Sequence, residues 1–291
     1  MPRFDRILIL DWSAAGLPVR GANSIWLGDD RGMLANPATR AQAAALLDAA
    51  VAEARAAGAR LLIGADFAFG HPSGLALRIT GRPEAQALWD HLEACHHDDD
   101  ANRSSYRDVA AGMNATLGRP VFWGDGRRTP TPNLPRLKPP PHPSLAPHRA
   151  TEAPLPGCPR PKSPFQLAGA GAVGAQSLTG IPRLNRLRRH RGVTVWPFQP
   201  WHDAMVVLAE VYPSMIAPEV RAARGYPCLD AAQVGLLARS LRHLDDRDAL
   251  VALLAPDPRI ADLASEGQIL GFGHTPALRV AAQAVLQAAP P

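Results

Sequence analysis

Cysteine is scarce in this sequence, and long apolar runs are absent. The chain holds 3 cysteines in 291 residues, far apart and without a C-x-x-C pair. This number and spacing argue against a disulfide framework and a structural zinc site. No apolar run reaches the roughly 18 to 20 residues of a membrane span, and the apolar stretch after MPRFDR is too short for a secretory signal. These absences predict a cytoplasmic protein with reduced thiols and no membrane association.

A phosphate-loop motif is also missing. The segment "KSPFQLAGAGAVGAQSLTGIP" is rich in glycine but lacks the order G-x-x-x-x-G-K-[ST]. Its glycines are better explained by close packing of helices than by a nucleotide cradle. Lys162, Gln166 and Gln176 in this segment are candidate substrate contacts.

Apolar residues and proline are plentiful. Hydrophobic residues make up 46% of the chain, which is enough for a sizeable core. Proline is so frequent from Thr129 to Pro164 that helices and inner strands cannot persist there. We therefore expect one domain over residues 1–291 with a Pro-rich surface insertion at 129–164.

Basic residues exceed acidic ones, giving a net charge of +5. This excess makes a phosphate-bearing partner such as nucleic acid possible. Part of the charge is concentrated in "IPRLNRLRRHRG", where Arg183, Arg186 and Arg188 are candidate phosphate contacts. A solvated helix face explains the same pattern equally well. The sequence leaves the oligomeric state open.

The order of apolar segments predicts an α/β fold. The strand "ILIL" is followed by two short strands, "NSIWLGDD" and "GMLANP", and by an Ala-rich helix that ends at Gly58. A fourth strand, "RLLIGADFAFG", is expected to return parallel to the first. A helix, the insertion, the strands "GVTVWPF" and "AMVVLAEVYPSMI" and a helix "LDAAQVGLLARSLRHLDD" complete a mixed sheet flanked by helices.

Acidic residues stand at the ends of several of these segments. Asp11 and Asp66 each follow an apolar strand, Glu210 lies within a later one, and Asp230 begins a helix. Carboxylates that converge on one sheet edge repel one another, so divalent cations would stabilise them. Mg²⁺ or Mn²⁺ suits such ligands, and two ions roughly 4 Å apart would support phosphodiester cleavage. All four acids are therefore candidate metal ligands and catalytic residues.

Each candidate also has a structural explanation. Asp11 and Asp66 are also explained as turn caps, Asp230 as a helix N-cap, and Glu210 as half of a buried ion pair. The run from His96 to Asp100 suggests a metal site, but consecutive residues cannot all face one ion. Three further residues have candidate roles near the site: His71 in proton transfer, and Trp12 and Tyr212 in stacking on a base.

Four short motifs occur in a defined order: "ILDWSAAG", "IGADFAFG", "AEVYPS" and "LDAAQVGLLA". Together they resemble the predicted RNase H-fold nucleases grouped as domain of unknown function 429, some of which are labelled molybdopterin guanine dinucleotide synthesis proteins. The resemblance implies an RNase H-like fold with Asp11 on the first strand and Asp66 on the fourth. It further implies Glu210 on the fifth strand and Asp230 on the last helix.

The resemblance and the acid pattern together predict a metal-dependent nuclease or phosphodiesterase. One alternative is a non-catalytic binding protein on the same scaffold. A less favoured alternative is a phosphotransferase similar to actin or sugar kinases, because Trp12-Ser13-Ala14 replaces their D-x-G-x-[ST] hairpin and no duplicated domain is present. Pairing of Glu210 with an arginine, together with Asp230 serving only as a helix cap, would favour the binding protein.

Overall fold

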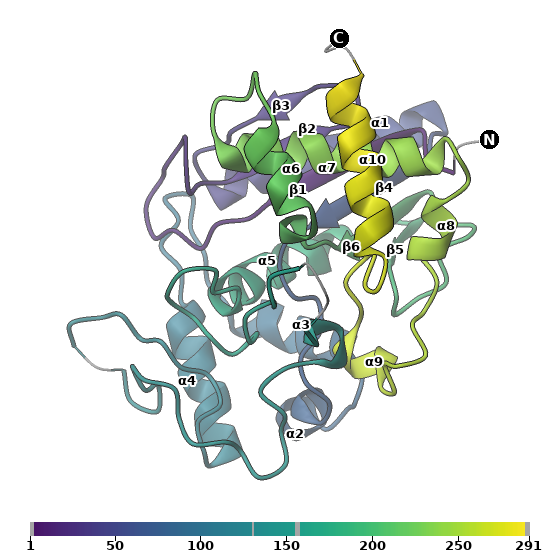
Figure 1. The fold of residues 1–291 in the computed structure, drawn as a ribbon. Coiled ribbons are helices and arrows are strands. Elements are labelled where there is room, and N and C mark those ends of the chain that lie inside the picture. The colour runs from purple at the N-terminus through teal and green to yellow at the C-terminus, as the bar shows by residue number, and fades with distance from the viewer. Residues whose placement is uncertain (1–2, 130, 155–157, 289–291) are drawn as a thin grey trace.

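A six-stranded sheet forms the centre of the structure. The computed structural model describes residues 3–129, 131–154 and 158–288. Within them the strands follow the spatial order β3-β2-β1-β4-β6-β5 (Figure 1). Their bounds are β1 Arg6–Asp11, β2 Trp26–Asp29, β3 Leu34–Ala35, β4 Leu61–Ala65, β5 Val193–Val195 and β6 Val206–Glu210.

The central strand β1 pairs in opposite senses on its two sides. It runs antiparallel to β2, with Leu10 opposite Leu27, and parallel to β4, with Leu10 beside Ala65. β6 lies parallel to both β4 and β5, whereas β3 is antiparallel to β2. The predicted three-strand meander and the parallel return of the fourth strand are confirmed, and the protein has an α/β fold with a mixed sheet.

Helices cover both faces of this sheet. The principal ones are α1 Arg40–Ala57, α3 Ala85–Cys95, α4 Tyr106–Leu117, α5 Gly174–Leu187, α7 Leu229–Asp245 and α10 Thr275–Gln287. Shorter elements are α2 Leu75–Thr80, η1 Ala150–Glu152, η2 Pro213–Ile216, α6 Ala217–Ala222, α8 Leu250–Leu253 and α9 Leu263–Glu266. In the described part of the chain, no helix is both long enough and apolar enough to cross a membrane.

Alternating side chains of the strands form two cores. Leu8 and Leu10 point to the face covered by α1, α3, α4 and α5, whereas Ile7 and Ile9 point to the face covered by α7 and α10. On the second face α10 packs against α7 (Figure 1). Because successive side chains of β1 point to opposite faces of the sheet, both faces make hydrophobic contacts with helices.

The local signals for α1 and α5 agree with the structure. Thr39 caps α1 by accepting a hydrogen bond from the Gln42 backbone, and Gly58 ends the helix at a φ of 62°. In α5, Gly180 lies against the ring of Phe67, where a Cβ atom would collide. At Gly180 the lack of a side chain thus permits a close contact with the segment that follows β4.

Two regions differ from expectation. The described part of the Pro-rich insertion has no regular helix or strand except the 3₁₀ turn η1, but it is not purely a surface feature, because Leu134, Leu145 and Arg149 are buried. The helix that begins near Asp230 is α7, and it is not the last helix, since α8, α9 and α10 follow it.

Candidate active site

Asp11 and Asp66 come together at the carboxyl ends of β1 and β4. The two strands are parallel neighbours in register, so the residues that follow Leu10 and Ala65 are adjacent. The Asp66 backbone N–H donates to the Leu10 carbonyl over 3.1 Å. The Trp12 backbone N–H donates to Asp66 Oδ1 over 2.7 Å. A side-chain hydrogen bond also links the two carboxyl groups.

The electrostatics of this pair are unfavourable for two negative charges. Burial, and then the charges of Asp66 and Asp230, raise the pKa of Asp11 well above its usual range. Burial raises the pKa of Asp66 to about 7, although the Trp12 N–H lowers it in part. A carboxyl–carboxyl hydrogen bond requires that one partner is protonated. Without a cation the pair therefore holds a proton near neutral pH, and a bound cation would displace that proton.

Asp230 lies close to the pair but does not cap its helix. The N-cap of α7 is Cys228, so the helix-cap explanation of Asp230 is wrong. Asp230 accepts hydrogen bonds from the Asn23 backbone over 2.5 Å and from the Gln233 side chain over 3.4 Å. Its charge raises the pKa values of both Asp11 and Asp66, so it contributes to the same electrostatic site.

Glu210 has different partners. Its two carboxylate oxygens accept from Arg149, at 2.7 Å from Nη1 to Oε2 and 2.5 Å from Nη2 to Oε1. The Phe69 backbone N–H donates to the same Oε2 over 2.9 Å. Both side chains of the pair are buried. The structure therefore uses Glu210 in a buried ion pair, and this geometry does not place it in the carboxylate cluster of Asp11, Asp66 and Asp230.

Arg149 connects the insertion to the sheet and was missed by the sequence reasoning. It also donates to Glu152 Oε1 over 2.7 Å and to the Glu266 carbonyl over 2.9 Å. Although burial lowers the pKa of Arg149, the charges of Glu210 and Glu152 raise it above its usual value. This network holds the part of the insertion around Arg149 beside β6. No pattern in the proline-rich segment indicates that Arg149 would pair with Glu210.

A cavity of about 590 Å³ opens beside Asp66. Its lining comes from four further regions: the insertion, the first turn of α5, η2 and α7. The polar lining residues are Arg160, Lys162, Gln176, Tyr212, Ser214 and Gln233. Lys162 and Gln176, two of the predicted substrate contacts, therefore lie at this cavity. The Gln176 side chain donates to the Trp12 carbonyl over 2.6 Å and so also steadies the loop after β1.

The other predicted substrate contacts lie elsewhere. Gln166 donates to the carbonyl of Ala168 over 2.9 Å, and it does not line the cavity. The three arginines at the end of α5 are each paired with an acid: Arg183 with Asp98 at 3.1 Å, Arg186 with Glu93 at 3.2 Å, and Arg188 with Asp90 at 2.7 Å. This arrangement agrees with the alternative of a charged helix face.

A second buried arginine holds the loop that follows Asp11. Arg40 is fully buried and binds both carboxylate oxygens of Asp98, at 2.8 Å from Nε and 2.6 Å from Nη2. Its Nη1 donates to the carbonyls of Ser13 and Ala15 over 3.2 and 2.8 Å. Asp98, one of the residues in the acidic run, is thus an ion-pair partner. Sequence patterns did not indicate this role for Arg40.

His71 and Trp12 are buried in the core. In the described chain neither ring nitrogen of His71 has a hydrogen-bond partner, and its ring lies 6.0 Å from those of Phe122 and Phe165. Burial, with the charge of Arg149, lowers the pKa of His71 to about 3. Trp12 is buried and donates to Thr179 over 3.0 Å. Neither side chain is placed for the candidate roles in proton transfer or stacking, whereas Tyr212 lines the cavity.

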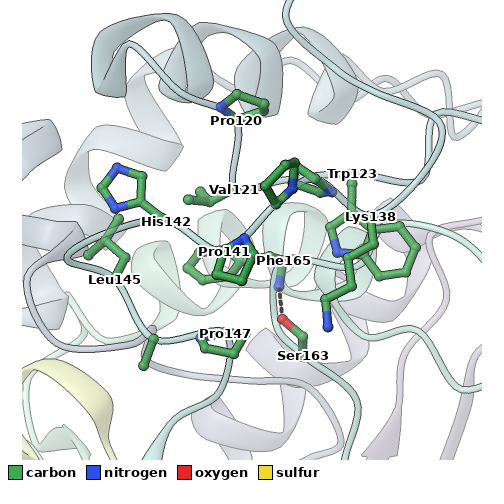
Figure 2. Close-up of a pocket in the computed structure, with 13 residues that line it drawn as sticks. Pro120, Val121, Trp123, Lys138, Pro141, His142, Leu145, Pro147, Ser163 and Phe165 are labelled. Atoms are coloured by element: carbon green, nitrogen blue, oxygen red, sulfur yellow. Dashed lines mark hydrogen bonds between the residues drawn. The ribbon is translucent and has the colours of Figure 1, made fainter.

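A smaller cavity of about 60 Å³ lies between the insertion and the segments that flank it. Figure 2 shows its mainly apolar lining, which includes Trp123, Pro141 and Phe165. Ser163 accepts a hydrogen bond from the Phe165 backbone at its edge. Lys138 also lines it, so the two lysines of the insertion lie at different cavities.

The donor atoms near Asp66 fit a hard divalent cation. Asp11 and Asp66 provide carboxylate oxygens, which Mg²⁺ and Mn²⁺ prefer, and burial together with neighbouring carboxylates raises the pKa of each. Within residues 3–129, 131–154 and 158–288, no group of three or more His, Cys, Asp or Glu side chains has the arrangement of a complete metal site. The remaining ligands would come from solvent or substrate oxygens, as Mg²⁺ commonly requires.

Comparisons with known proteins give no match from which a function could be inferred. The chain matches no protein-family model, no curated protein and no solved structure. The fold and the site together define an α/β protein in which two carboxyl groups meet at the carboxyl ends of central parallel strands, and one of them, Asp66, lines a cavity with basic residues in its wall.

Proposed function

We propose that this protein is a cytoplasmic, metal-dependent nuclease or phosphodiesterase on an RNase H-like scaffold. The observation that carries the proposal is the convergence of Asp11 and Asp66 from two parallel strands beside a cavity with cationic walls. The antiparallel meander followed by parallel strands supports the RNase H-like assignment, as do the motifs that resemble domain of unknown function 429.

The proposed metal ligands are Asp11 and Asp66, with Asp230 contributing charge. A bound Mg²⁺ or Mn²⁺ would supply a water of lowered pKa and stabilise charge on the leaving oxygen. The Trp12 N–H fixes the orientation of the Asp66 carboxylate, and Gln176 holds the Trp12 carbonyl. Arg160 and Lys162 offset the negative charge of a phosphodiester that enters the cavity. Glu210 acts indirectly, by holding Arg149 and with it the insertion.

The test is hydrolysis of single-stranded, duplex, hybrid and branched nucleic acids in Mg²⁺ or Mn²⁺. The wild-type protein is compared with Asp11→Asn and Asp66→Asn, which keep the size of each side chain but remove its charge. Asp48→Asn is a matched control, because Asp48 is exposed on α1 and pairs with His190 at 3.5 Å. We expect metal-dependent cleavage that both site variants lose and the control retains. Cleavage that persists in Asp11→Asn and Asp66→Asn would contradict the proposal.

A second candidate function is a non-catalytic binding protein on the same scaffold. The specific observation in its favour is the Arg149–Glu210 pair, which leaves fewer acids for metal binding than a four-carboxylate site would have. This candidate predicts nucleic-acid binding by folded protein with no cleavage in either metal. The same panel of substrates therefore separates the two functions.

A further inference from the structure

The wall of the cavity beside Asp66 carries a positively charged side chain that has no partner among the described residues. Lys162 is exposed, and within the described residues its ammonium group makes no hydrogen bond or ion pair. Arg160 uses its Nε to donate to the Glu152 carbonyl over 3.1 Å, which orients its guanidinium at the same cavity. Most basic groups of α5, in contrast, are paired with acids of α3 or its flanking loop. The free positive charge near Asp66 thus comes from the insertion.

The insertion is held firmly where it meets the cavity. Pro159 and Pro161 lie with Tyr212 and Met215 around a small adjoining pocket, and Arg149 and Glu152 of the insertion belong to the buried network around Glu210. Proline restricts the backbone, so Arg160 and Lys162 are presented from a stiff segment. Ordered cations lose less conformational entropy when they bind an anion.

The dimensions of the cavity limit what can reach Asp66. A volume of about 590 Å³ is in the range of sites that enclose a ligand of one or two nucleotides' size. Its walls come from the insertion, the first turn of α5, η2 and α7, and its volume is smaller than a segment of duplex several base pairs long. Tyr212 is partly buried and lines the cavity, and aromatic side chains are the usual stacking partners of unpaired bases.

We propose that the site takes a single-stranded nucleic acid, with a backbone phosphate against Lys162 and Arg160 and an unpaired base on Tyr212. This inference rests on the proposed function, since it names the substrate class of the same site. It makes Lys162 and Tyr212 substrate-binding residues, and it gives the Pro-rich insertion a role in selecting single-stranded over duplex nucleic acid.

The test is binding measured by fluorescence anisotropy in EDTA, with a labelled oligothymidylate and a blunt duplex of the same length as probes. All proteins carry Asp66→Asn, which removes a proposed metal ligand and the repulsion between its carboxylate and phosphate. Lys162→Gln is compared with Lys138→Gln, a matched control at the smaller cavity, since the chain has no other lysines. Tyr212→Leu tests stacking, and circular dichroism verifies the fold of each variant.

We expect the single strand to bind at least about tenfold more tightly than the duplex. Lys162→Gln and Tyr212→Leu should each weaken binding about tenfold, and Lys138→Gln should leave it unchanged. Equal affinity for the two probes, or equal losses in the two lysine variants, would overturn the inference while metal-dependent cleavage by the wild type could still hold. Selective binding through Lys162, combined with no cleavage in Mg²⁺ or Mn²⁺, would support the inference and contradict only the proposed function.

Discussion

Two neighbouring strands of the sheet end in carboxyl groups with opposite surroundings. β4 leads into Asp66, which lies beside Asp11, and its pKa is raised by burial to about 7. β6 ends in Glu210, which is adjacent in register to Ala65 but is paired with Arg149. The two acids occupy similar positions in similar apolar sequences. The comparison teaches that the cationic partner, rather than the position at a strand end, decides whether a carboxylate is structural or available for a ligand.

The largest expected effect on the free energy of unfolding comes from removing Arg149, the positively charged partner of Glu210. Arg149→Met should lower the free energy of unfolding by about 3–5 kcal/mol, because it leaves Glu210 and Glu152 buried without a counter-charge. Chemical denaturation at pH 7 measures this change. Arg188→Met is the control, since its ion pair with Asp90 is partly exposed and should contribute at most about 1 kcal/mol. Equal effects of the two substitutions would show that Glu210 does not depend on Arg149.

The next effect concerns His71, whose pKa burial and the Arg149 charge lower to about 3. As pH falls below about 6.5, the unfolded chain binds a proton that the folded protein does not, so stability falls until pH reaches the folded-state pKa. At pH 4 this loss should be about 3 kcal/mol relative to pH 7. The His71→Leu variant should lack that part of the acid sensitivity. The free energy of unfolding of both proteins is measured by denaturation at several pH values from 7 to 4. An equal loss of this free energy in the wild type and in His71→Leu would contradict the explanation.

The smallest expected effect on the free energy of unfolding concerns Asp66, and it is a stabilisation instead of a loss. Asp66→Asn should raise the free energy of unfolding by about 1 kcal/mol in metal-free buffer at pH 8, because it removes a buried charge that lies near Asp230. The amide oxygen can still accept from the Trp12 N–H. Glu210→Gln, measured alongside by denaturation, should destabilise the protein. A destabilised Asp66→Asn variant would mean that the two strand ends are equivalent after all.

The sequence predicted the first half of the fold well for local reasons. The strand from Arg6 to Asp11, the turn after Asp29 and the helix ending at Gly58 each have a strong local signal. The Asp29 side chain, for example, accepts from the backbones of Arg31 and Met33 in the predicted turn. The parallel return of β4 followed from the handedness of the crossover.

The candidate site was predicted only in part. Asp11 and Asp66 could be inferred to meet because parallel strand ends share one edge. The partners of Glu210 and Asp98 could not, because Arg149 and Arg40 reach them from segments 61 and 58 residues away in sequence. Periodicity reports which face a residue occupies, but it carries no information about which distant charge will neutralise it.

The most direct test of the central claim is calorimetric titration of the metal-free protein with Mn²⁺. If Asp11 and Asp66 form a cation site, the wild-type protein and the Asp48→Asn control should bind Mn²⁺, and Asp11→Asn and Asp66→Asn should not. Folded wild-type protein that binds no Mn²⁺, or binding that is unchanged in the two site variants, would contradict the claim.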